Sequence, residues 1–142
     1  MGVAAADVRV TGRAALPAAT VRRIVRAVLA GERRKAEVSV TFLGLTRMTA
    51  LNRDYLGHDR PTDVIAFGLT QPDGGLVGDV YVCRAVAERE ARHRGIPLRQ
   101  ELVRLVVHGT LHVLGWDHPM DESRVRAPMW RRQERYVARL AP

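Results

Sequence analysis

Residues 108–118 read HGTLHVLGWDH, a stretch in which histidines flank the predicted end of a helix. His108 and His112 are four residues apart, so on a helix their Cβ atoms lie about 6 Å apart on one face. Gly115 can adopt the left-handed backbone conformation that ends a helix. His118 follows three residues later and can turn back toward the same point. The stretch therefore predicts that these three histidine side chains converge at the C-terminal end of a helix.

This convergence favours a metal site over a role in core packing. A single histidine at helical spacing is commonly a core residue with a hydrogen-bond partner, and a pair four residues apart leaves the choice open. The third histidine favours Zn²⁺, because three neutral imidazoles in a tetrahedral site leave the fourth position for water or substrate. We therefore expect one zinc ion per chain, bound by His108, His112 and His118. Asp117 can orient one of these ligands through a hydrogen bond, or it can be a plain turn residue.

The residue after the first histidine bears on the chemistry. The histidine spacing is that of the metzincin zinc motif, in which Glu follows the first histidine and acts as the general base. Here that residue is Gly109. No clear side-chain base is then left, so deprotonation of a zinc-bound water falls to the metal, which can lower the pKa of the water to about 7. Peptidase activity is therefore disfavoured.

The rest of the chain alternates between strand and helix patterns. Period-two alternation and turn residues predict four strands, at residues 6–10, 37–43, 63–69 and 77–83. Apolar residues at helical spacing predict five helices, at residues 17–31, 46–55, 84–94, 97–115 and 128–140. Residues 72–75, Pro-Asp-Gly-Gly, supply the turn of a hairpin between the third and fourth strands. The predicted fold is α+β, a small mixed β-sheet of about four strands with about five helices packed on it.

Particular residues are expected to begin or end these helices. Gly31 is well placed to end the first helix, and Thr46 can cap the second. Pro128 is expected in the first turn of the last helix, because a proline in mid-helix costs about 3 kcal/mol. Tyr136 and Leu140 are expected on the inner face of that last helix.

Size and composition indicate one domain. The chain has 142 residues, a typical single-domain length, and no repeat or long linker divides it, so we expect one domain over residues 1–142. No apolar run approaches the roughly 18 to 20 residues that a membrane span needs. Because the start also lacks a signal-peptide pattern, we expect a cytoplasmic protein. Cys83 is the only cysteine, which excludes an internal disulfide and thiolate zinc sites.

The charge balance points to an anionic partner. The chain carries 23 Lys and Arg residues against 15 Asp and Glu residues, a net charge of +8, and Lys35 is its single lysine. Such an excess favours nucleic acid, since each neutralised phosphate releases counterions. A well-solvated basic surface without such a partner explains the charge equally well.

The histidine motif resembles that of the YbeY family of bacterial ribosomal RNA maturation endoribonucleases. The family motif is His-Gly-x-Leu-His-Leu-x-Gly-Tyr-Asp-His, and here Val113 and Trp116 are conservative replacements. A second family segment, Leu-Asn-x-x-Tyr-Arg-x-x-Asp-x-Pro-Thr-Asp-Val-Leu-Ser-Phe, is similar to residues 51–67, and residues 78–80 match its Gly-Asp-Ile strand. The resemblance spans about residues 38–140.

This resemblance implies a zinc-dependent endoribonuclease specific for single-stranded RNA. In the family the activity serves 16S rRNA 3′-end maturation and ribosome quality control, which implies the small ribosomal subunit as a partner. The resemblance also implies a zincin-like fold related to zinc peptidases. The expected mechanism uses either a metal-activated water or a metal-polarised phosphodiester. Two alternatives stay open: a non-catalytic ribosome assembly factor with a structural zinc, and a metal-dependent hydrolase of another substrate such as a peptide.

The chain departs from the family pattern at Leu56, where the family usually carries an arginine that is thought to face the RNA phosphate. Arg53 or Arg60, one turn or one loop away, can supply a phosphate contact instead, and His58 is a further candidate. A solvated surface position is the alternative for each of them. Trp116 lies beside the predicted ligands, where it can stack on a base or pack in the core.

Overall fold

The four strands and five α-helices follow one another along the chain in the predicted order. The fold is described from a computed structural model for residues 8–13, 15–119 and 122–142. Its strands are β1 (Val8–Gly12), β2 (Glu37–Leu43), β3 (Val64–Thr70) and β4 (Leu76–Cys83). Its helices are α1 (Ala18–Gly31), α2 (Leu45–Leu56), α3 (Arg84–Arg94), α4 (Leu98–Val113), the short 3₁₀ helix η1 (Glu122–Arg126) and α5 (Pro128–Leu140). The architecture is α+β with a four-stranded mixed sheet, as the sequence predicted.

The sheet has the strand order β1-β2-β4-β3. β1 pairs parallel with β2, and β2 pairs parallel with β4. β3 and β4 form the predicted antiparallel hairpin, whose turn is closed by a 2.6 Å hydrogen bond from the Gln71 N–H to the Gly75 carbonyl. Val80 of β4 pairs with Val40 of β2 and Ala66 of β3. Because alternate strand residues face opposite sides, this register presents all three to the same face of the sheet.

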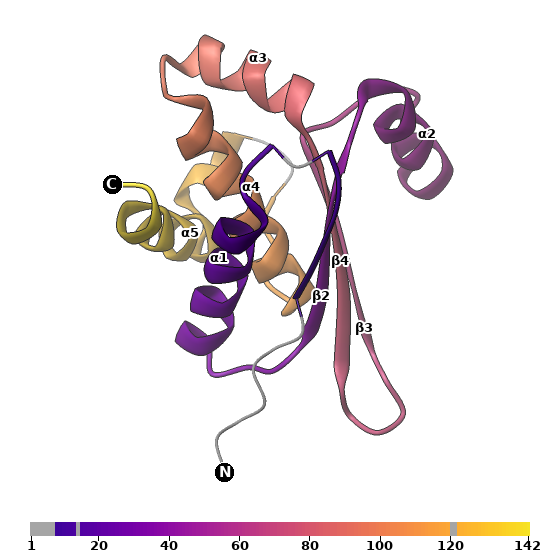
Figure 1. Ribbon diagram of the computed structural model, residues 1–142, viewed down its shortest axis with the longest axis vertical. Coiled ribbons are helices and arrows are strands. Elements are labelled where there is room, and N and C mark those ends of the chain that lie inside the picture. The colour runs from indigo at the N-terminus through magenta and orange to yellow at the C-terminus, as the bar shows by residue number, and fades with distance from the viewer. Residues whose placement is uncertain (1–7, 14, 120–121) are drawn as a thin grey trace.

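Helices α1, α4 and α5 lie on one side of the sheet and form the main core with it (Figure 1). α1 buries the five residues that its helical spacing predicts, Val21, Ile24, Val25, Val28 and Leu29. α4 is buried along most of its length, because it packs against β3, β4, α1, α3 and α5. A helix that is apolar on nearly all sides is typical of such a central position. The C-terminal end of α4, which carries the first two histidines, is therefore held in place by the core.

A smaller cluster lies on the opposite face of the sheet, where α2 packs (Figure 1). Its buried residues are Leu43, Met48, Ile65, Cys83 and Val86. Cys83 is a buried free thiol, which agrees with a role as a small hydrophobic residue. α2 thus closes one end of this face.

Tertiary contacts decide two helix ends that the sequence predicts differently. Gly31 is the last residue of α1, but Arg33, with a φ of 55°, takes the left-handed conformation expected of Gly31. A Cβ at Gly31 would overlap the ring and hydroxyl of Tyr136, so this glycine is needed for packing against α5. The predicted cap at Thr46 is wrong: α2 begins at Leu45 after an N-cap glycine, which leaves Thr46 inside the first turn. The first strand was predicted from residue 6, and residues 6 and 7 lie outside the described ranges.

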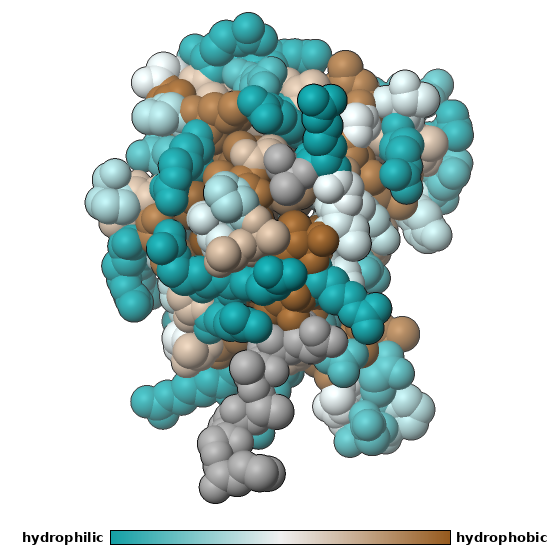
Figure 2. Space-filling model, viewed as in Figure 1, coloured by the Kyte–Doolittle hydropathy of each residue, from teal (hydrophilic) through white to brown (hydrophobic). Residues whose placement is uncertain are grey.

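The face of the molecule that Figure 2 draws is mainly polar. Figure 2 shows hydrophilic side chains over most of one face, with apolar residues visible between them near the middle. None of the helices in the described ranges combines the length and apolarity that crossing a bilayer requires. The single domain over residues 1–142 stays a prediction.

Candidate metal centre

The histidines of the sequence motif lie at and just beyond the C-terminal end of α4. His108 and His112 belong to the last turns of this helix. Gly115 has a φ of 97°, the left-handed conformation predicted for it. The N–H of Trp116 then donates to a carbonyl of α4 at 3.0 Å, which keeps the chain close to the helix end. This turn brings His118 beside the two helical histidines.

The rings of His108, His112 and His118 converge. Their centroids are 4.7, 4.9 and 5.0 Å apart in the three pairs. One potential ligand atom from each lies within 4.8 Å of the others, and all three residues are partly buried. Among the described residues, no other group of three or more His, Cys, Asp or Glu side chains has such an arrangement. The predicted convergence is confirmed, and the three side chains could hold a metal ion.

Two of the imidazoles also have a hydrogen-bond partner that orients them. Nδ1 of His108 lies 2.6 Å from Oε1 of Gln133, and Nδ1 of His118 lies 2.7 Å from the carbonyl oxygen of Pro119. Because an oxygen acceptor faces Nδ1 in both rings, Nδ1 carries the proton there and Nε2 is left as the ligand atom. Three neutral nitrogen donors of this kind fit a zinc site with an open fourth position.

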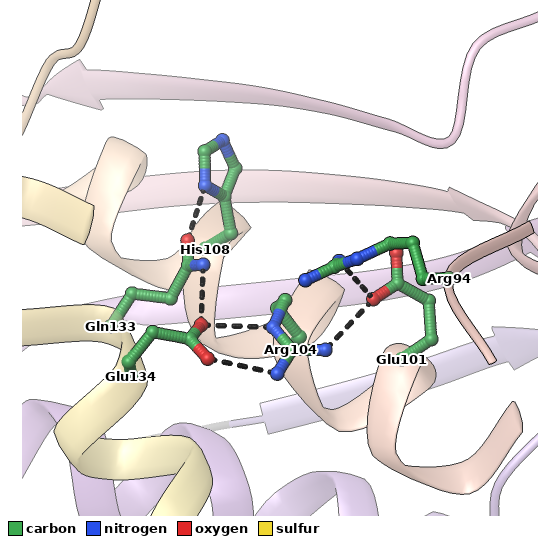
Figure 3. A network of polar contacts seen from close by, with 6 residues as sticks. All are labelled: Arg94, Glu101, Arg104, His108, Gln133 and Glu134. Atoms are coloured by element: carbon green, nitrogen blue, oxygen red, sulfur yellow. Dashed lines mark hydrogen bonds and ion pairs between the residues drawn. The ribbon is translucent and has the colours of Figure 1, made fainter. Parts of the chain in front are cut away.

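A chain of polar contacts supports Gln133 from behind (Figure 3). Gln133 is fully buried, and its Nε2 donates to Glu134 at 2.9 Å. Glu134 accepts two 2.8 Å hydrogen bonds from Arg104, which also donates to Glu101 at 3.0 Å. Arg94 completes the chain through a 3.2 Å ion pair with Glu101. Because the double contact from a planar guanidinium fixes the carboxylate of Glu134, the amide of Gln133 is held in one orientation.

Burial is the main influence on the pKa of the two helical histidines, His108 and His112. It lowers the pKa of His108 to about 4, although the hydrogen bond with Gln133 acts in the opposite direction. Burial also lowers the pKa of His112, and the neighbouring His118 adds to this effect. Metal binding requires neutral imidazoles, so these shifts keep the two helical histidines ready to bind near neutral pH.

The histidines open into a cleft of about 490 Å³ whose walls come from β3, α3, α4, η1 and α5. Burial raises the pKa of the Asp63 carboxyl in this cleft, and Glu90 adds to the rise. Arg94 and Arg104 also line the cleft, and both are paired with carboxylates. Arg124 lines it without an ion pair to any described carboxylate. Its guanidinium is therefore the cleft charge that is most available to an anion.

The sequence-predicted phosphate contacts lie away from this cleft. Arg53, His58 and Arg60 are exposed and do not belong to its lining. Arg53 forms a 3.2 Å ion pair with Asp54. Leu56 does line the cleft, with half of its surface exposed, so an apolar side chain stands where the family usually has arginine. Phosphate binding by Arg53 or Arg60 stays a prediction.

Asp117 and Trp116 have local structural contacts. Oδ1 of Asp117 accepts a 2.8 Å hydrogen bond from the backbone N–H of His118, which is the contact of a turn residue. The indole N–H of Trp116 donates to Glu32 at 3.0 Å. The guanidinium carbon of Arg132 lies 4.6 Å from the centre of the indole ring, so one ring face is covered. Trp116 therefore packs against the core, which is one of the two roles that the sequence left open.

Sequence reasoning missed Gln133 and Arg124. A signal existed for Gln133, because an amide interrupts the buried face of α5 that also carries Met129 and Tyr136. No comparable signal separates Arg124 from the other arginines of the chain.

The structure also explains why no glutamate follows the first histidine. A Cβ at Gly109 would overlap the side chain of Val80, since this face of α4 packs closely against β4. The position therefore faces the sheet and leaves no room for a side chain that reaches the metal. The general base of the zinc-peptidase motif has no place at this position.

Comparison with known proteins identifies the family. The family model described as Endoribonuclease YbeY matches residues 10–141. This chain belongs to the YbeY family. Endoribonuclease YbeY of Stenotrophomonas maltophilia is 40% identical over 119 residues, which cover 78% of this chain and 74% of that protein. The four-stranded mixed sheet and the histidine triad agree with the zincin-like fold expected of a YbeY protein.

Other relatives are similar over different lengths. Endoribonuclease YbeY of Chromohalobacter salexigens is 44% identical over 90 residues, which cover 61% of this chain and 58% of that protein. The aligned part is thus less than two thirds of the length of that YbeY protein. The solution structure of TM1509 from Thermotoga maritima has a TM-score of 0.66 and 28% identity, and the match covers 94% of this chain and 88% of that one.

Proposed function

We propose that this YbeY family member is a zinc-dependent endoribonuclease that cleaves single-stranded RNA. The observation that carries the proposal is the convergence of His108, His112 and His118 in the wall of an open cleft. The match of residues 10–141 to the Endoribonuclease YbeY family supports the choice of substrate. The single triad found among the described residues supports one zinc ion per chain.

The protein's own contribution to the chemistry is orientation. When bound to the triad, zinc supplies Lewis-acid chemistry, by activating water or by polarising the phosphodiester. Gln133 holds the His108 ring with Nε2 free, and the carbonyl of Pro119 does the same for His118. Because Gly109 occupies the position of the usual glutamate base, no side chain of α4 is assigned to proton abstraction.

Binding of the RNA backbone falls to arginine. Arg124 acts electrostatically on both His108 and Asp63, so its charge lies near the triad and the cleft wall. We assign it a phosphate contact next to the scissile bond, where it holds the strand without reading sequence. Arg53 and Arg60 are proposed to contact phosphates farther along the strand. A single strand suits this cleft, because its backbone can bend into a site that a duplex cannot enter.

The cellular role follows from the family. The proposed substrate is 16S rRNA, with cleavage at its 3′ end during maturation and in ribosome quality control. The small ribosomal subunit is the proposed partner and the cytoplasm the proposed location. The net charge of +8 supports a ribonucleoprotein partner.

The test combines elemental analysis with a nuclease assay on the wild type and His112→Ala. The wild type should carry zinc and cleave single-stranded RNA, and the variant should lose both properties. His93→Ala is the matched control, because His93 is exposed on α3 and outside the cleft lining. A His112→Ala protein that keeps one zinc per chain and full RNA turnover would refute the proposal. Normal ribosomal RNA ends in cells that carry only this variant would favour the assembly-factor alternative, and peptide cleavage without RNA would favour the other hydrolase.

A further inference from the structure

A second groove, of about 760 Å³, lies on the outer side of α5. α5 buries the face that carries Gln133, and its other face lines the groove with Arg131, Arg132 and Arg135. Arg132 is neutralised by a 3.0 Å ion pair with Glu32. Arg131 and Arg135 are exposed and form no ion pair with a described carboxylate. The groove therefore offers two arginine charges to an anionic ligand.

The groove also contains both tryptophans of the chain. Trp116 is held rigidly under the guanidinium of Arg132. Glu134 is the carboxylate in the lining, and its charge is already bound by two hydrogen bonds from Arg104. Trp130 lines both this groove and the histidine cleft, so the two cavities adjoin at its side chain.

We infer that this groove binds the part of a single-stranded RNA that flanks the phosphodiester held at the histidines. The inference rests on the proposed function, because it takes the strand in the cleft to be RNA. Arginine charges that follow the backbone, together with an aromatic face for a base, are the usual means of binding single strands without sequence preference. Arg131 and Arg135 supply the charges. The guanidinium carbon of Arg94 lies 5.9 Å from the centre of the Trp130 ring on one side, so the other ring face supplies the stacking surface. Single-stranded RNA is favoured over an acidic protein surface, because the groove adjoins, at Trp130, the cleft that is proposed to hold the substrate.

The test compares a double variant, Arg131→Ala with Arg135→Ala, with the wild type on two RNA lengths. Strands of roughly 4 and roughly 16 nucleotides bracket the usual range of single-strand site sizes. Each lost phosphate contact removes about 0.7 from the slope of log affinity against log salt concentration, so the loss of two removes about 1.4. At about 0.1 M salt this corresponds to a loss of about 20-fold in kcat/KM on the longer strand. The shorter strand, which fills only the cleft, should be cleaved as by the wild type. Replacement of both residues by lysine should restore most of the loss.

The matched control removes the same charge elsewhere. Arg23 and Arg26 are exposed on α1 and line neither cavity, so their double alanine variant should behave as the wild type. Binding of the longer strand to the metal-free protein gives the affinity without cleavage. A groove variant that binds and cleaves the longer strand like the α1 control would overturn the inference. A wild type that binds the longer strand through Arg131 and Arg135 but cleaves neither RNA would contradict the proposed function and leave the groove as a binding site.

Discussion

Replacement of Gln133 by leucine tests the metal centre directly. Leucine has a similar size, but it cannot accept the hydrogen bond from Nδ1 of His108 at 2.6 Å or donate to Glu134 at 2.9 Å. The imidazole then keeps a buried N–H without an acceptor and loses the contact that selects its tautomer. We expect the protein to fold but to bind zinc more weakly.

The structure allows both effects to be estimated. A buried donor left without a partner costs about 1–3 kcal/mol of folding free energy. Loss of the partner that orients a histidine ligand typically lowers metal affinity about 10- to 100-fold, which corresponds to about 1.4–2.8 kcal/mol of binding free energy. Glu134 keeps its two hydrogen bonds from Arg104, so α5 should stay in place.

The assay is competition for zinc between the protein and a chromophoric chelator, with urea denaturation of the metal-free protein beside it. Gln100→Leu is the matched control, because Gln100 lies in the first turn of α4 and outside both cavities. Zinc affinity of Gln133→Leu equal to that of Gln100→Leu would refute the role of the polar chain in orienting the ligand.

Three further outcomes are expected from the same structure. Arg104→Met should lower the free energy of unfolding by about 3 kcal/mol in urea denaturation, because Glu134 loses its ion pair and buried Glu101 keeps only the one with Arg94. Arg84→Met, which breaks an exposed pair, should cost at most about 1 kcal/mol, and an equal loss in both would contradict the reasoning. Gly109→Ala should destabilise by about 1–3 kcal/mol, since its Cβ overlaps Val80, and adding Val80→Ala should recover part of the loss in the same denaturation assay. The metal-free protein should lose stability as the pH falls from 6.5 to about 4, because His108 takes up a proton in the unfolded chain while burial keeps it neutral in the fold. The unfolded state then binds more protons, which is worth up to about 3 kcal/mol, and His108→Gln should flatten this part of a stability curve measured against pH.

Helix α1 shows why much of the fold could be predicted. Its apolar residues recur at helical spacing, so they can be buried only on one side of a helix, and the structure buries all of them. The helix ends were less predictable, because distant contacts decide them. Gly31 is required by the hydroxyl of Tyr136, which comes from α5, and no local pattern reveals that approach.

The candidate site was also predictable from the sequence only in part. His108, His112 and His118 lie within one short segment, so helix and turn geometry alone bring them together. Gln133 reaches His108 from 25 residues away in sequence, through the packing of α5 on α4. Arg53 is close to Leu56 in the chain but does not line the cleft, so proximity in sequence does not decide whether it contacts phosphate.

The close approach at Gly109 also explains why a glutamine on α5 orients the first ligand. One step along a helix turns the side-chain direction by about 100°, so a residue 109 that faces the sheet turns His108 and His112 together toward one flank of α4. That flank is the one on which α5 packs, and Gln133 lies on the buried face of α5. The contact that leaves no room for a base on α4 therefore also places the first histidine beside its acceptor. The proposed mechanism assigns no base to α4, so it depends on this orientation of the histidines that would hold the metal.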